Sequence, residues 1–474
     1  MTQPVNSPHF NELARTALGD ASLQKALSRF ETGFIQRRRA AVGRLPEYDA
    51  MRDSARDLKD HVLAHLDLYL EAYEKSVVAA GGHVHFAATA EEANEIILGI
   101  CRRLNAKTVA KGKSMISEET GLNDYLEANG VRPVETDLGE YIIQLRGETP
   151  SHLISPAMHV TKEQVEADFR RAHTGLPPER NLDEATSLLA EARAMLRDTF
   201  LRVDVGITGA NFLVAETGSS IIVTNEGNGD LTQTLAKAHV VISSIEKVVP
   251  TLEDASLFVR LLARSGSGTE ITAYTTFSTG PRRPGDPDGP QEYHVVLLDN
   301  GRANMLGGRF QEMLRCIRCS ACMNHCPVFH AVGGHAYGWV YSGPMGAVLI
   351  PSLVGVERGG KLPNASTFCG RCEEVCPVRI PLPKLMRNWR EREFERHLQP
   401  LAARYGLGLW AAFARRPALY RLATGLAMRV LGWFGGKGRF RTLPLAGSWT
   451  RYRDFPAPPG ETFQSLWNKR KAAP

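Results

Sequence analysis

The sequence lacks a long apolar run. No stretch reaches about 18 uninterrupted apolar residues, the length that a membrane-spanning helix requires. The nearest candidate, Leu407 to Phe434, is interrupted by four arginines. The first residues, MTQPVNSPHFNE, also lack the charged segment and apolar run of a secretory signal. These absences favour a cytoplasmic protein.

Cysteine is scarce outside one region. Of the eight cysteines, seven lie between Cys316 and Cys376, and Cys101 stands alone in a predicted helix. A reducing compartment argues against a disulfide framework, and clustered thiols there more often bind metal. We therefore interpret Cys101 as a small buried apolar residue and the other seven as candidate metal ligands.

Acidic residues are scarce near the C-terminus. From Pro377 to Pro474 there are 19 Lys and Arg against 5 Asp and Glu, a net of +14, whereas the whole chain carries only +6. Residues 391–474 also hold four tryptophans, Trp410, Trp433, Trp449 and Trp467. We expect an acidic protein partner first and peripheral contact with an anionic membrane second. The alternative is a solvated basic face with its tryptophans packed on the body. No nucleic-acid-binding motif is present, and we expect no nucleic-acid partner.

The hydrophobic pattern divides the chain into four predicted parts. Residues 1–80 read as a helical segment that ends at two glycines. Residues 81–300 alternate β-rich and helical runs, which predicts an α/β domain with a largely parallel sheet. Residues 301–390 carry the cysteines on a predicted α-helical module. Residues 391–474 form the basic tail, with a predicted helical middle and an extended end.

The cysteines fall into two related runs. The first, CIRCSACMNHCP (316–327), has the spacing of bacterial ferredoxins. The second, CGRCEEVCP (369–377), repeats its last three cysteines and the proline with an offset of 50 residues. In this register Ser366 stands where the first run has Cys316. The wide separation of the runs resembles the helical ferredoxin module of succinate dehydrogenase iron–sulfur subunits.

Ferredoxin spacing assigns the ligands, because the last cysteine of each run binds the other cluster. The first cluster is predicted to bind Cys316, Cys319, Cys322 and Cys376, and the second Cys326, Cys369 and Cys372. We predict two [4Fe–4S] clusters. The fourth iron of the second cluster has no cysteine ligand, and its ligand is the Ser366 oxygen, His325, a water or a group of a partner protein. Alternatively, this iron is absent and the cluster is [3Fe–4S]. Zinc is the alternative metal, although zinc sites rarely repeat such a run.

Three further segments carry polar residues in suggestive patterns. The glycine- and hydroxyl-rich blocks 206–211, 216–220 and 225–229 predict either a cradle for an anion or tight turns. His152 and His159 lie in one loop-rich segment and suggest a metal or proton-transfer site, or ordinary histidines. Lys111 and Lys113 suggest contact with an anion or, more commonly, solvated loop charges.

The segments ISEETGLNDYLEANG, RGETPSHLISPAMH and TGANFLVAETGSSIIVTNEGN precede the two cysteine runs. In this combination the sequence resembles the lactate utilization protein B family, iron–sulfur subunits of a bacterial L-lactate-oxidising complex. The resemblance covers nearly the whole chain. It implies that residues 81–300 form a lactate-utilisation (LUD) domain, related in fold to sugar isomerases and CoA transferases.

The resemblance also implies a function. It implies that the seven cysteines are cluster ligands, with three cysteines in the second run as in the family. It implies two partner subunits, one cysteine-rich and one a small α/β protein, and oxidation of L-lactate to pyruvate for growth on lactate. It indicates neither a catalytic residue nor the electron acceptor. We therefore expect an electron-transfer subunit; the alternatives are a ligand-binding α/β enzyme with regulatory clusters and a scaffold for the partner subunits.

Overall fold

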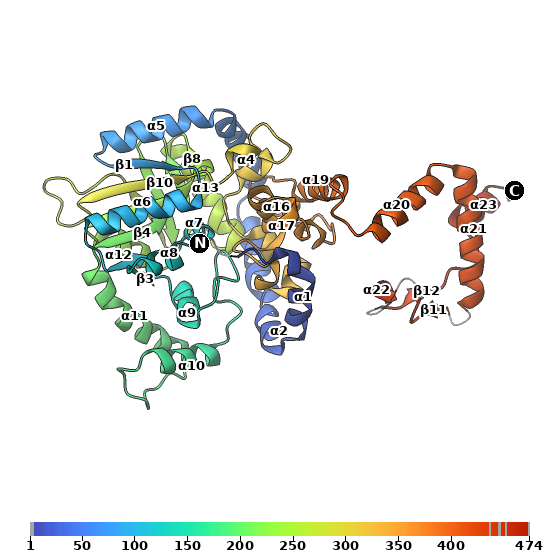
Figure 1. Ribbon diagram of the computed structural model, residues 1–474, viewed down its shortest axis with the longest axis horizontal. Coiled ribbons are helices and arrows are strands. Elements are labelled where there is room, and N and C mark those ends of the chain that lie inside the picture. The colour runs from blue at the N-terminus through green and yellow to red at the C-terminus, as the bar shows by residue number, and fades with distance from the viewer. Residues whose placement is uncertain (1–3, 436–437, 444–446, 451–452, 473–474) are drawn as a thin grey trace. The chain divides into compact units, whose positions relative to one another are not determined.

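The computed structural model describes residues 4–435, 438–443, 447–450 and 453–472. The chain forms two compact units, Met1–Glu393 and Phe394–Pro474, each described here by itself (Figure 1).

A six-stranded parallel sheet forms the centre of the first unit. Its strands lie in the order β1 (His83–Ala87), β10 (Glu292–Leu298), β7 (Ala238–Ser244), β4 (Val205–Gly209), β2 (Thr108–Lys111) and β3 (Arg132–Glu135). Alternate side chains of β10 face opposite sides: Val296 packs with the core under helix α6 (Ala90–Arg103), and Val295 with the core under α5 (Leu66–Ala79). The predicted α/β domain with a largely parallel sheet is confirmed.

A smaller mixed sheet packs beside it. Its order is β8 (Val248–Val249), β5 (Phe212–Val214), β6 (Ser219–Thr224) and β9 (Tyr274–Ser278). The β5–β6 turn contains Gly218, whose φ of +68° favours glycine and whose Cα faces the backbone of Val77. Gly206 lies so close to Thr232 that a Cβ would come within 1.9 Å of its carbonyl oxygen. Both glycines therefore serve close packing against helices, which favours the tight-turn interpretation of these two blocks over an anion cradle.

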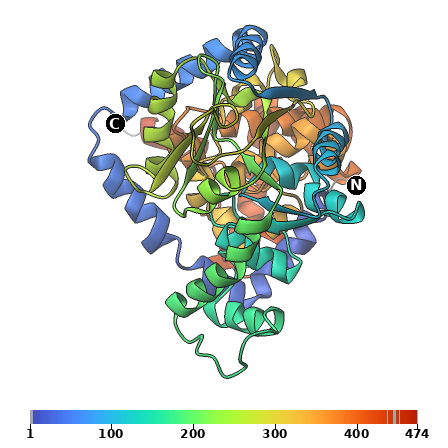
Figure 2. The same ribbon diagram turned by 90° about the vertical axis from the view of Figure 1, so that its left-hand side faces the viewer.

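Helices cover both faces of the large sheet. The remaining helices of this region are α4 (Tyr48–Ala64), α7 (Met115–Thr120), α8 (Leu122–Ala128), α9 (Leu138–Arg146), α10 (Lys162–Ala172), α11 (Ala185–Arg202), α12 (Asn228–Thr234) and α13 (Leu252–Gly266). Figure 2 shows α10 and α11, in green, extending away from the sheet.

The cysteine region packs against the N-terminal helices in one shared core. Its helices are α14 (Ala321–Asn324), α15 (Pro327–Val332), α16 (Gly343–Val354), α17 (Val356–Gly359), α18 (Arg371–Glu374) and α19 (Leu382–Glu395). The N-terminal helices are α1 (Phe10–Gly19), α2 (Ala21–Leu27) and α3 (Gln36–Gly43). Gln24 donates to the Ala331 carbonyl at 2.9 Å, and Ser7 donates to the Tyr337 carbonyl at 2.9 Å. These contacts fix the start of the chain on the cysteine region.

The second unit is helical with one short hairpin. It contains α20 (Leu401–Ala414), α21 (Pro417–Phe434), α22 (Gly447–Thr450), α23 (Phe463–Ala472) and the antiparallel pair β11 (Arg439–Phe440) and β12 (Phe455–Pro456). The prediction of an extended end is wrong, because Thr462 accepts the Ser465 N–H at 3.2 Å at the start of α23 and Glu461 pairs with Lys469. The side chain of Trp449 lies outside the described residues. Among the residues described, no helix is both long and apolar enough to cross a membrane.

Candidate metal centre and acidic pocket

Four of the predicted ligands line one cavity. They are Cys316, Cys319, Cys322 and Cys376, and the rest of the lining is mostly apolar. The backbone N–H of Arg318 donates to the Cys316 sulfur at 3.4 Å, and that of Ile380 donates to the Cys376 sulfur at 3.4 Å. Such bonds favour the charged thiolate, the form that binds metal.

The other three predicted ligands line a second cavity. Cys326, Cys369 and Cys372 share it with Ser366 and His325. Cys369 is exposed, whereas Cys326 and Cys372 are buried. The second cavity therefore reaches the surface at Cys369. The two cavities are neighbours, because the charge of Cys372 acts on Cys322 in the first cavity.

Ionising the thiols that line the two cavities costs free energy when no cation lies among them. Burial raises the pKa of Cys376 to about 11 and that of Cys372 to about 12, and neighbouring cysteines add to the effect in both. Buried thiols this close together ionise only when positive charge lies among them, which iron would supply. Among the described residues no three His, Cys, Asp or Glu side chains are arranged to hold one metal ion. Four thiols around one cavity and three around the next are a donor set that fits iron–sulfur clusters.

Cationic residues of the protein surround the first cavity. Arg318 is buried beside Cys316 and pairs with Glu246 at 3.2 Å. Lys59 donates to the Glu246 carbonyl. Burial lowers the pKa of Lys59 to about 8 and that of Lys247 to about 7. Glu246 and Lys247 lie in the turn after β7, and the charge of Cys316 acts on Lys247, so the first cavity abuts the carboxyl end of a sheet strand.

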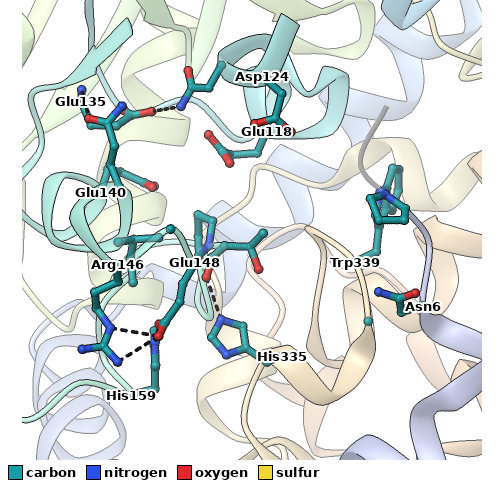
Figure 3. A pocket seen from close by; sticks show the side chains of 18 of the residues that line it. Asn6, Glu118, Asp124, Glu135, Glu140, Arg146, Glu148, His159, His335 and Trp339 are labelled. Carbon is teal, nitrogen blue, oxygen red and sulfur yellow. Dashed lines mark hydrogen bonds and ion pairs between the residues drawn. The ribbon is translucent and has the colours of Figure 1, made fainter. Parts of the chain in front are cut away.

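A larger acidic pocket lies elsewhere in the first unit (Figure 3). It has a volume of about 830 Å³, and its lining comes from the N-terminal segment, from residues 118–164 of the α/β domain and from residues 335–339. Its acidic lining residues are Asp20, Glu118, Asp124, Glu127, Glu135, Glu140 and Glu148. Open α/β sheets bind ligands outside the carboxyl ends of their strands, and β3 ends at Glu135, in this lining.

Lys111 organises the inner wall of this pocket. Its ammonium donates to Glu118 at 2.8 Å and to Ser117 at 2.8 Å, and it pairs with Glu135 at 2.6 Å. Lys111 is 1% exposed. The prediction of a solvated loop charge is therefore wrong for Lys111, and the anions that it meets are side chains of its own domain.

Glu140 is the unusual group of the pocket. It is 4% exposed, and its Oε1 has no hydrogen-bond partner among the described residues. Burial, followed by the charges of Glu118 and Glu135, raises the pKa of Glu140 well above its ordinary value. Figure 3 shows its carboxyl group and that of Glu118 directed into the same space. A raised pKa favours the protonated form of this carboxyl group, which makes Glu140 a candidate proton donor.

The two predicted histidines have separate surroundings. His152 is buried, bonds to Asn324 at 2.7 Å, and burial lowers its pKa to about 3. His159 lines the acidic pocket and contacts Glu148 at 2.8 Å and Ser151 at 2.7 Å. His152 is a satisfied core residue, whereas His159 is part of the pocket wall.

Sequence reasoning missed the acidic pocket. Glu118 and Glu119 were visible in the segment ISEETG, but Glu135 and Glu140 stand in separate segments. The signal that could have found them is their position after two predicted strands, since parallel strands end at the same edge of a sheet.

Three family models match consecutive parts of the chain. The LUD domain matches residues 70–298, the 4Fe-4S dicluster domain residues 312–380, and the family described as lactate utilisation protein B, C-terminal, residues 370–472. A LUD domain joined to a 4Fe-4S dicluster domain defines the class of protein to which the fold and the cysteine cavities belong.

Curated relatives match over the full length. The chain is 40% identical to lactate utilization protein B of Bacillus licheniformis over 99% of this chain and 98% of that protein. It is 41% identical to the proteins of the same name from Macrococcus caseolyticus and Geobacillus kaustophilus, over 99% of each chain. The structure of a DUF162 family protein from Deinococcus radiodurans is 12% identical in sequence, with a TM-score of 0.27. The match covers 49% of this chain and 98% of that protein. The chain belongs to the lactate utilization protein B family.

Proposed function

We propose that the protein is the iron–sulfur electron-transfer subunit of a complex that oxidises L-lactate to pyruvate. Its family and its relatives' names support a role in lactate utilization. The observation that carries the proposal is the division of seven cysteines between two adjacent cavities, four lining one and three the other. Clusters bound there would accept and release single electrons.

We propose two clusters, one in each cavity. The first binds Cys316, Cys319, Cys322 and Cys376, and the second Cys326, Cys369 and Cys372. Buried apolar residues exclude water from the first cavity, and Arg318 offsets the negative charge that its four thiolates bring. The exposed Cys369 gives the second cavity contact with the surface. Electrons therefore pass from the side of the α/β domain through the first cavity to an acceptor that docks near Cys369.

The experiment compares two cysteine variants in a strain that grows on L-lactate. Cys319→Ala removes a proposed ligand, whereas Cys101→Ala removes the lone buried cysteine of α6, far in sequence from both runs. We expect Cys319→Ala to abolish growth on lactate and to lower the iron content, and Cys101→Ala to do neither. Full growth of the Cys319→Ala strain would contradict electron transfer through the first cavity.

A second candidate function is a ligand-binding enzyme site in the α/β domain. The buried Glu140 Oε1, which has no hydrogen-bond partner among the described residues of the acidic pocket, supports it. A ligand there must bring hydrogen-bond donors, because Glu135 Oε2 and Asn123 Oδ1 are also buried acceptors without partners among the described residues.

Two glutamine variants test this second function. Glu140→Gln should lower lactate turnover by the assembled complex and leave the cluster spectrum unchanged. Glu127→Gln, at an exposed position of the same pocket, is the control and should change neither. Equal turnover by both variants would remove the pocket from the reaction.

We also propose that the chain assembles with two other subunits, one cysteine-rich and one a small α/β protein. The second unit supports this, since every residue of α20 and α21 is described and none is buried. From Phe394 to the end the chain carries 14 Lys and Arg against 3 Asp and Glu. The fitting partner surface is an apolar groove with an acidic rim.

A further inference from the structure

The two cysteine runs share a rare backbone conformation. Arg318 has a φ of 58° and its counterpart Phe368, fifty residues later, has 54°. Ser320 has a φ of 65° and its counterpart Gly370 has 81°. Positive φ is uncommon for residues other than glycine. Two matched pairs at the same offset mean that both runs form the same turn.

The matching extends to the short helix that follows each turn. Helix α14 spans Ala321–Asn324 and helix α18 spans Arg371–Glu374, again fifty residues apart. The repeat is therefore structural, and a position in one run has a defined counterpart in the other.

Ser366 occupies the position of Cys316 in this repeat. The N–H of Arg318 donates to the Cys316 sulfur at 3.4 Å, and the N–H of Phe368 donates to the Ser366 hydroxyl oxygen at 3.1 Å. The two side chains therefore turn the same way relative to their backbone. Ser366 also lines the second cavity with Cys326, Cys369 and Cys372.

His325 is the competing group at the same cavity. Its Nδ1 bonds to the Ala321 carbonyl at 2.9 Å, an arrangement common for metal-binding histidines. In the repeat, however, His325 corresponds to Val375, which does not line the first cavity. The symmetry of the two turns favours Ser366.

We propose that the Ser366 hydroxyl oxygen is the fourth protein ligand of the second cluster, completing three thiolates with one oxygen. This inference rests on the proposed two-cluster function. The hydroxyl proton leaves to solvent on coordination, as the three thiol protons do.

The test measures iron and paramagnetism in protein purified without oxygen. The wild type should hold about eight iron atoms, as two cubane clusters require, and give no signal in electron paramagnetic resonance when oxidised. Ser366→Ala should lose about one iron atom and gain the signal of an oxidised [3Fe–4S] cluster, whose three ferric ions leave an unpaired spin. Thr367→Ala, which removes the neighbouring hydroxyl in the same cavity, should resemble the wild type.

Two cysteine variants keep the test decisive if Ser366→Ala is unstable. Ser366→Cys should hold about eight iron atoms and release iron to a chelator more slowly than the wild type, because it restores a fourth thiolate. Thr367→Cys should release iron at the wild-type rate.

Three results would overturn the proposal. They are an unchanged spectrum in Ser366→Ala, a loss of iron in His325→Ala but not in Ser366→Ala, and a [3Fe–4S] signal in the wild type even with ferrous iron supplied. The last leaves the two-cluster function intact. Wild-type protein without iron would instead contradict the proposed function itself.

Discussion

At the scale of single residues, a buried ion pair joins the α/β domain to the cysteine region. Arg302 and Glu119 are both 0% exposed, and their closest contact is 2.7 Å. Tyr341 of the cysteine region donates to the same carboxylate at 2.6 Å. The burial of Glu119 alone would raise its pKa, but Arg302 and the hydrogen bonds lower the pKa below its ordinary value.

We therefore expect Arg302→Met to destabilise the first unit strongly. It leaves the buried Glu119 carboxylate without its cationic partner, which costs about 3–5 kcal/mol in free energy of unfolding. The exposed pair Arg44–Glu270 is the control, and Arg44→Met should leave the free energy of unfolding nearly unchanged. Anaerobic urea unfolding measures both, and equal losses would show that the buried pair has no special role.

Arg318 should raise the reduction potential of the first cluster. Its guanidinium, buried beside Cys316, favours the added negative charge of a reduced cluster. Arg318→Gln should make the reduction potential more negative by on the order of 60 mV, a tenfold change in the equilibrium constant for adding one electron. A potentiometric titration followed by electron paramagnetic resonance measures the shift. An unchanged potential would mean that Arg318 acts only in packing.

The convergence of some site residues could be predicted from the sequence, and that of others could not. The seven cysteines follow from spacing, because short turns fix which side chains meet. Glu118, Glu135 and Glu140 meet only because β2 and β3 end at the same edge of the sheet and Lys111 neutralises two of them. That convergence depends on strand order, which the pattern of residues does not encode locally.

At the scale of elements, helices α20 and α21 have no buried residue. Helices α20 and α21 expose large apolar side chains, among them Leu422 at 72% and Trp433 at 82%. Sequence predicted that the middle of the tail is helical. It did not predict α23, because the polar end of the chain has no apolar periodicity and its helix depends on the Thr462 cap and the Glu461–Lys469 pair.

Replacing two of these side chains should weaken assembly. The double variant Leu422→Ser and Trp433→Ser should lose co-purification with the two partner subunits and keep its iron. Leu201→Ser, at a 61% exposed position of α11 in the first unit, is the control and should co-purify normally. Normal co-purification of the double variant would assign docking to another surface.

At the scale of the whole molecule, the cysteines and the tail belong to different compact units. All seven proposed cluster ligands lie before Glu393, where the first unit ends. A chain that ends at His397 should therefore fold and bind about eight iron atoms. Iron content and the visible absorption spectrum test this. Loss of the clusters in the shortened chain would show that the second unit is needed to form them.

The positions of the two cavities define the proposed direction of electron transfer. The first abuts the carboxyl end of β7, and the second reaches the surface at Cys369. Sequence predicted the ligands of each cluster but not which one lies near the α/β domain, because that depends on how the N-terminal helices and α13 pack around the cysteine region.

The most direct measurement follows the clusters while lactate is oxidised. The assembled complex, purified without oxygen and without an electron acceptor, is mixed with L-lactate, frozen rapidly and examined by electron paramagnetic resonance, while pyruvate is assayed in the same samples. The account predicts that reduced-cluster signals appear together with pyruvate. Formation of pyruvate while both clusters stay oxidised would contradict it.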